Sequence, residues 1–141
     1  IFDTQNVVAD SIENYRFRQA LEKWVDLARK ANGYFDSKQP WVTRKTDMVR
    51  TGTTLYVCMQ VVKALCILME PFIPDGSYAL AKIINVEIKR QGPEGGSDIW
   101  SEISKPLPAG SPLSTPQVLF PKLEQEYIEK LAEEHEQGLA S

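Results

Sequence analysis

An apolar stripe more than five helical turns long is the feature that most constrains the fold of this chain. Apolar side chains recur at spacings of three and four residues, which place them on one face of an α-helix. The stripe consists of Phe17, Ala20, Leu21, Trp24, Leu27, Ala28, Ala31 and Phe35. Asn32–Gly33 would ordinarily favour a turn, but Phe35 continues the period beyond it. The sequence therefore predicts one long helix from about Tyr15, which Pro40 ends.

A second long helix is predicted from about Asp47 to Glu70. Its apolar side chains fall into two stripes, one of Leu55, Cys58, Met59, Val62, Leu65, Cys66 and Met69, the other of Val57, Val61, Ala64 and Leu68. A helix that is apolar nearly all round is expected at the centre of a fold. Its longest apolar run, residues 55–73, is interrupted by Gln60, Lys63 and Glu70, so we predict no membrane span.

Shorter helices are predicted on either side of these two. The stretch Thr4–Glu13 is weakly amphipathic, and Asn14 is a candidate N-cap for the long helix that follows it. Pro71 and Pro74 close the second long helix. Asp75 is then a candidate cap for a third helix over residues 76–84.

The composition changes after Asn85. Glycines crowd residues 92–96, and five prolines fall within residues 106–121, a density that excludes regular helix or strand. We therefore expect residues 86–121 to form an irregular segment that lies over the core. A terminal helix is predicted over residues 122–138, which carry Leu123, Tyr127 and Leu131 at helical spacing.

The composition fits a single globular domain. The chain has 141 residues, 43% hydrophobic and 25% charged, and no signal peptide is recognised at its start. The net charge of −3 does not by itself indicate a nucleic-acid-binding protein. Residues 122–141 are acidic, with six glutamates and two lysines. On one helix, Cys58 and Cys66 would lie about 12 Å apart along the axis, too far for a disulfide. They are interpreted as buried, reduced thiols of a cytoplasmic protein.

No pattern in the sequence supports catalysis by this chain. The single histidine, His135, lies among glutamates, without a nearby nucleophile or a second metal ligand. No phosphate-binding glycine motif is present, and the glycines of residues 92–96 do not open a helix in the required way. No catalytic residue and no metal site are assigned.

Trp100 is the residue that stands out. It follows the glycine-rich loop and lies outside the long helical stripes. An indole in such a position can plug the core from a loop, or it can serve as a platform on which a nucleic-acid base stacks. Lys89, Arg90 and Lys105 lie near it in sequence and could contact phosphates, although scattered cations are commonly only solvated. The residues alone leave both interpretations open.

Several segments resemble the anticodon-binding domains of class I aminoacyl-tRNA synthetases. The first long helix has an aromatic residue followed by Ala20-Leu21, then Ala31-Asn32-x-Tyr34, then Pro40-Trp41, and LCILMEPFIP (residues 65–74) resembles the second helix and its exit. A tryptophan after a loop, Pro106-Leu107, and LFPKLE at residues 119–124 are similar to the end of the methionyl domain. The resemblance covers essentially the whole chain.

The resemblance implies an all-α helical bundle over residues 1–141, attached in the full-length enzyme to a catalytic Rossmann domain. It implies that Trp100 stacks on anticodon bases of methionine tRNA, with Lys89, Arg90 and Lys105 as possible phosphate contacts. It also implies that Asn32 and Tyr34 contact the core and that Trp41 packs. ATP, and zinc through the family's zinc knuckle, belong to the full-length enzyme, with no cofactor implied for this chain.

One family feature is missing from the sequence as given. The family reads the anticodon with an Asn-x-x-x-Arg pair on an earlier helix, as it carries the catalytic HIGH and KMSKS signatures elsewhere. Asn14 and Arg18 have the spacing but fall at the start of the wrong helix, so they are not assigned. We expect that the pair lies upstream of Ile1.

Two alternatives to a methionyl anticodon-binding domain remain at this point. One is a helical adaptor that binds protein, with Trp100 as an interface anchor. The other is the anticodon-binding domain of a related class I synthetase with a different tRNA specificity.

Overall fold

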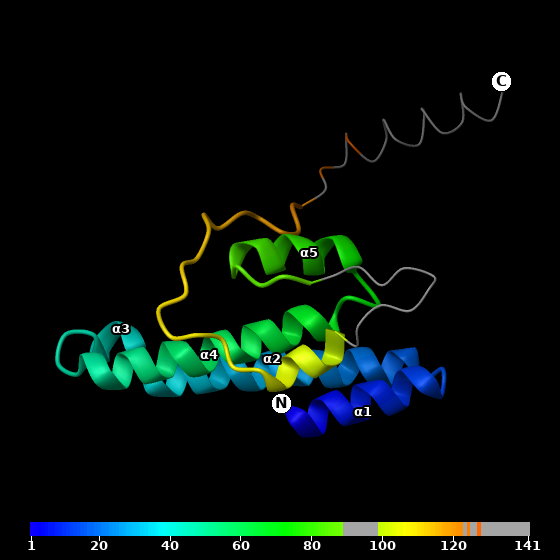
Figure 1. The fold of residues 1–141 in the computed structure, drawn as a ribbon, viewed down its shortest axis with the longest axis horizontal. Helices are drawn as coiled ribbons and strands as arrows, with labels where there is room; N and C mark the ends of the chain where they lie inside the picture. The colour runs from blue at the N-terminus through cyan, green and yellow to red at the C-terminus, as the bar shows by residue number, and fades with distance from the viewer. Residues whose placement is uncertain (89–98, 123, 125–126, 128–141) are drawn as a thin grey trace.

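A computed structural model describes residues 1–88, 99–122, 124 and 127, and the regular secondary-structure elements of these residues are all helices. The elements are α1 (Phe2–Glu13), α2 (Phe17–Lys38), α3 (Pro40–Thr43), α4 (Met48–Leu68), α5 (Pro74–Ile83) and the 3₁₀ helix η1 (Ile99–Ser104). α4 contacts α2, α3, α5 and η1, while α1 packs on α2 (Figure 1). The predicted all-α bundle is confirmed for this part of the chain.

α2 runs as a single helix through Asn32 and Gly33, as its apolar period predicts. Gln39 takes a left-handed conformation (φ 46°) after the last turn, and Pro40 then opens α3 at a position that needs no amide hydrogen. The Trp41 ring packs 5.5 Å from the Phe35 ring, as expected for a packing residue. The expected core contact of Asn32 is wrong, because this side chain is exposed.

Both predicted side-chain caps are corrected by the structure. Asn14 ends α1 rather than starting α2, and its Nδ2 donates to the Asp10 carbonyl at 2.8 Å. The reason is Tyr15, whose left-handed φ of 58° inserts a turn before α2 begins at Phe17. Asp75 lies inside the first turn of α5 and makes no cap hydrogen bond, because Pro74 starts that helix one residue earlier.

α4 is the central helix of the bundle, and it begins where the sequence predicts. The Asp47 side chain accepts a hydrogen bond from the Arg50 amide at 2.9 Å, a standard N-cap. With 21 residues, α4 is long and apolar enough to cross a membrane by length and composition. Its contacts with four other helices within the described residues are instead those of a bundle core helix.

The expectation that α4 is buried nearly all round is only half right. Its C-terminal half is buried, whereas Leu55 and Val57 in the first half are 46% and 37% exposed. Polar side chains fill part of the buried face instead. Thr51 and Thr54 are tolerated there because their hydroxyls donate to carbonyls one turn back, those of Asp47 and Arg50.

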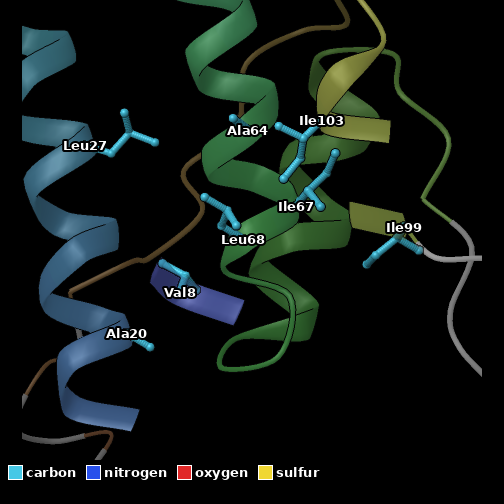
Figure 2. Close-up of a cluster of buried hydrophobic side chains, with 8 residues drawn as sticks. All are labelled: Val8, Ala20, Leu27, Ala64, Ile67, Leu68, Ile99 and Ile103. Atoms are coloured by element: carbon cyan, nitrogen blue, oxygen red, sulfur yellow. The ribbon is translucent and has the colours of Figure 1, made fainter. Parts of the chain in front are cut away.

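The core lies where α4 meets α1, α2 and η1. Its buried members are Val8, Ala20, Leu27, Ala64, Ile67, Leu68, Ile99 and Ile103. Figure 2 shows Ile67 beside Ile103, whereas Leu68 lies on the side of Val8. Ile67 and Leu68 are adjacent on α4 but pack toward different elements, η1 and α1. η1 is therefore part of the core.

The segment expected to be irregular over residues 86–121 contains η1, a regular element that the sequence analysis missed. The proline-rich part behaves as predicted and follows the bundle without helix or strand. It passes over α5, where the Ser114 amide donates to the Ile83 carbonyl at 2.9 Å (Figure 1). The terminal helix predicted over residues 122–138 lies almost wholly outside the described residues.

Candidate nucleic-acid interface

η1 holds Trp100 at the surface of the bundle. Ile99 and Ile103 are 4% and 8% exposed and face the core, which leaves Trp100 half-buried at its edge. The Trp100 carbonyl accepts a hydrogen bond from Gln5 Nε2 of α1 at 3.1 Å. Trp100 therefore packs against the core, as the core-plug interpretation predicts, and its outer part borders solvent.

A cleft of about 510 Å³ opens between Trp100 and α1. Its lining is partly apolar and partly hydrogen-bonding: Gln5, Asn6, Ala9, Ile12 and Glu13 of α1, Pro71 after α4, and Trp100. The volume is within the ordinary range for a small-ligand site. Two amides, a carboxylate and an indole are groups that proteins use to bind a nucleic-acid base by its edge and its face.

The cations predicted near Trp100 are only partly placed. Lys105 follows η1, is exposed, and contacts Glu102 Oε1 through Nζ at 2.6 Å. The hydrogen bond from Lys105 holds the pKa of the Glu102 carboxyl below its ordinary value. An exposed pair of this kind contributes little free energy, so Lys105 remains free to exchange its partner for a phosphate. Lys89 and Arg90 lie outside the described residues.

Sequence reasoning did not identify the α1 side of this cleft. Gln5, Asn6 and Glu13 lie on a helix whose pattern is weak, and 95 residues separate Gln5 from Trp100. The available signal was the presence of these polar side chains on a short amphipathic helix. Nothing in the local pattern could show that this face borders η1, because that contact depends on the tertiary fold.

Other reactive groups in the described residues do not form a second site. Within the described residues, no cluster of three histidine, cysteine or acidic side chains could hold a metal ion. His135 lies outside these residues. Both cysteines are free, Cys66 buried and Cys58 only partly buried. Neither cysteine forms a disulfide in the structure, and the burial predicted for Cys58 is incomplete, because the first half of α4 is less covered.

Cys66 is expected to make the stability of the fold decrease at alkaline pH. Its Sγ lies 3.2 Å from the Ser77 carbonyl, and burial raises the pKa of the thiol from 9.0 to about 11. The native state thus keeps a proton that the unfolded chain releases, so this contribution is intact below pH 9 and is lost as the pH rises through 11. Urea unfolding at several pH values measures it. The decrease between pH 9 and 11 should be smaller in Cys66→Ala, and parallel curves would contradict the prediction.

The structure therefore defines a helical bundle with a half-buried tryptophan beside a surface cleft. Comparisons with known proteins then specify the class. A family model described as the anticodon binding domain of methionyl tRNA ligase matches residues 4–138. The methionine–tRNA ligases of Pyrococcus abyssi and Pyrococcus horikoshii are 44% and 43% identical over 122 residues, which cover 86% of this chain.

A solved structure agrees with the sequence relatives. The apo methionyl-tRNA synthetase of Mycobacterium tuberculosis is 26% identical, and it superposes with a TM-score of 0.67 over 87% of this chain. The chain spans 15% of the length of the Pyrococcus enzymes and 25% of the Mycobacterium chain. It belongs to the family of methionyl-tRNA ligase anticodon-binding domains, as the resemblance implied.

Proposed function

We propose that this domain binds the anticodon loop of methionine tRNA and stacks an anticodon base on Trp100. The observation that carries the proposal is the half-buried indole of η1, which borders a cleft with hydrogen-bonding groups from α1. Family membership favours this function over that of a protein adaptor. No feature of the cleft favours the adaptor. Family membership also favours methionine tRNA over the tRNA of a related synthetase.

The proposal assigns separate tasks to the residues that line the cleft and to three cations predicted from the sequence, of which Lys105 does not line it. The indole supplies a stacking surface that accepts any base, so it contributes affinity more than selectivity. The side chains of Gln5, Asn6 and Glu13 offer donors and acceptors for a base edge. Lys105, with Lys89 and Arg90, supplies the phosphate contacts. ATP-dependent charging with methionine takes place in the catalytic domain of the same cytoplasmic enzyme, the second partner in this proposal.

Titration of the chain with hairpins tests the proposal. We expect a methionine-anticodon stem-loop to bind more tightly than the same hairpin with a changed anticodon, by about 1–3 kcal/mol, the usual discrimination of a base-reading contact. Tryptophan emission reports binding. If Lys89, Arg90 and Lys105 each meet one phosphate, log K should fall with log salt concentration at a slope of about −2.

Two lysine variants control the salt experiment. Lys105→Ala should make the slope shallower by about 0.7, the value for one phosphate of a single strand. Lys82→Ala removes an exposed lysine from the last turn of α5 and should leave the slope unchanged. Equal binding of both hairpins by the wild-type chain would show that the domain does not read the anticodon.

A further inference from the structure

Lys63 is a buried lysine in the C-terminal half of α4. It is 5% exposed, and its Nζ donates to the Lys105 carbonyl at 2.7 Å, just past the end of η1. A buried ammonium loses its hydration, which costs free energy. This desolvation lowers the pKa of Lys63. A Leu or Met would fill the same space without that cost. The specific gains from Lys63 are therefore the contact that it makes with the backbone after η1 and its electrostatic attraction to Glu102 of η1.

Lys63 is one of three α4 side chains that hold this backbone. Gln60 Oε1 accepts from the Leu107 amide at 3.0 Å, and the Tyr56 hydroxyl donates to the Leu107 carbonyl at 3.1 Å. We call Tyr56, Gln60 and Lys63 the α4 polar row. Their spacings of four and three residues place them on one face of the helix. The row contacts Lys105 and Leu107, the residues on either side of Pro106. Pro106 itself has no amide hydrogen to donate.

The opposite end of η1 is held from a different helix. Gln5 of α1 donates to the Trp100 carbonyl, five residues before Lys105. Between the two attachments, Ile103 inserts into the core beside Ile67, and Ile99, one residue before Trp100, is buried as well (Figure 2). Trp100 therefore sits on a short helix that is fixed at both ends by side chains and on one face by core packing. Such support is what fixes the orientation of a binding side chain.

We propose that Lys63, together with Tyr56 and Gln60, is a positioning residue that sets the orientation of the Trp100 indole. The consequence for RNA rests on the function proposed above. An indole held in one orientation needs no ordering when a base stacks on it, so its binding free energy is not spent on that step. Lys63 itself does not line the cleft. Its effect on RNA binding passes through η1.

Fluorine NMR of the free chain tests the positioning directly. Incorporation of 5-fluorotryptophan gives one signal for each of the three tryptophans, and Trp100→Ala assigns the signal of Trp100. In Lys63→Met we expect the Trp100 signal to shift or broaden while those of Trp24 and Trp41 stay in place. The matched control is Lys23→Met, which removes an exposed lysine from α2 and should change none of them. An unchanged Trp100 signal in Lys63→Met overturns the proposal.

Hairpin binding supplies the functional readout. Lys63→Met should weaken the methionine-anticodon hairpin by about 5- to 10-fold, the size of one lost positioning hydrogen bond, with little change in the unfolding midpoint. In a Trp100→Ala background the same substitution should have no further effect. If Trp100→Ala loses binding but Lys63→Met does not, the positioning role is overturned and the anticodon role stands.

The two proposals can fail separately. If Trp100→Ala binds the hairpins like the wild type, the anticodon role of Trp100 fails, and the fluorine signals alone decide whether Lys63 positions the indole. If Lys63→Met loses its cooperative unfolding, Tyr56→Phe takes its place, because it removes only a hydroxyl from a partly exposed ring. A smaller change of the Trp100 signal is then expected, and no change overturns the proposal.

Discussion

Replacing Ile67 with alanine is expected to lower the free energy of unfolding by about 2–5 kcal/mol, the usual cost of a large-to-small change in a core. Ile67 is fully buried, and its side chain lies beside Ile103 of η1 (Figure 2). The truncation removes apolar contacts and leaves a cavity that the helices on both sides cannot fill without moving. Urea unfolding followed by circular dichroism measures the change through the midpoint and slope of the transition.

Ile73 provides the matched control for this substitution. It is the same residue type, it follows α4 by only a few residues, and it is 40% exposed. Ile73→Ala should therefore cost about 1 kcal/mol, because less apolar surface leaves water at this site on folding. If both variants lost the same stability, the contact between α4 and η1 would not be a core contact, and the attachment of η1 would rest on its hydrogen bonds alone.

The long helices could be predicted from the sequence because their signals are local. Spacings of three and four residues specify α2 over 22 residues, and Asp47 and Pro40 mark boundaries that the structure confirms. The boundary errors come from backbone conformations that no side-chain pattern reports. Tyr15 takes a left-handed φ although it is neither glycine nor asparagine, and this shifts the cap from Asn14.

The parts that could not be predicted depend on contacts between distant residues. η1 is short, and its buried Ile99 and Ile103 have no clear meaning until α4 lies beside them. In the sequence, Lys63 only interrupts an apolar run. In the structure it is buried, because its ammonium finds the carbonyl of Lys105, 42 residues away. The sequence singled out Trp100 by its unusual position, but the other wall of the cleft comes from α1 at the far end of the chain.

Trp100→Ala is expected to weaken binding of the methionine-anticodon hairpin by about 1–3 kcal/mol, the contribution of one base stacked on an aromatic ring. Alanine leaves no flat surface at the cleft, while Gln5 and Asn6 remain in place. Trp100→Phe should lose less, because a phenyl ring keeps a smaller face for the base. Titration by fluorescence anisotropy of a labelled hairpin measures all variants alike, since it does not depend on tryptophan emission.

The control for this prediction is a tryptophan elsewhere in the same fold. Trp41 is 46% exposed and packs on Phe35 near the junction of α2 and α3, away from the cleft lining. Trp41→Ala should therefore leave hairpin affinity unchanged. Trp100 also packs against the core, so each variant needs an unfolding curve that shows a folded chain at the titration temperature. A folded Trp100→Ala with wild-type affinity would remove the indole from the binding site, and the hydrogen-bonding side chains of α1 would then be the groups to substitute.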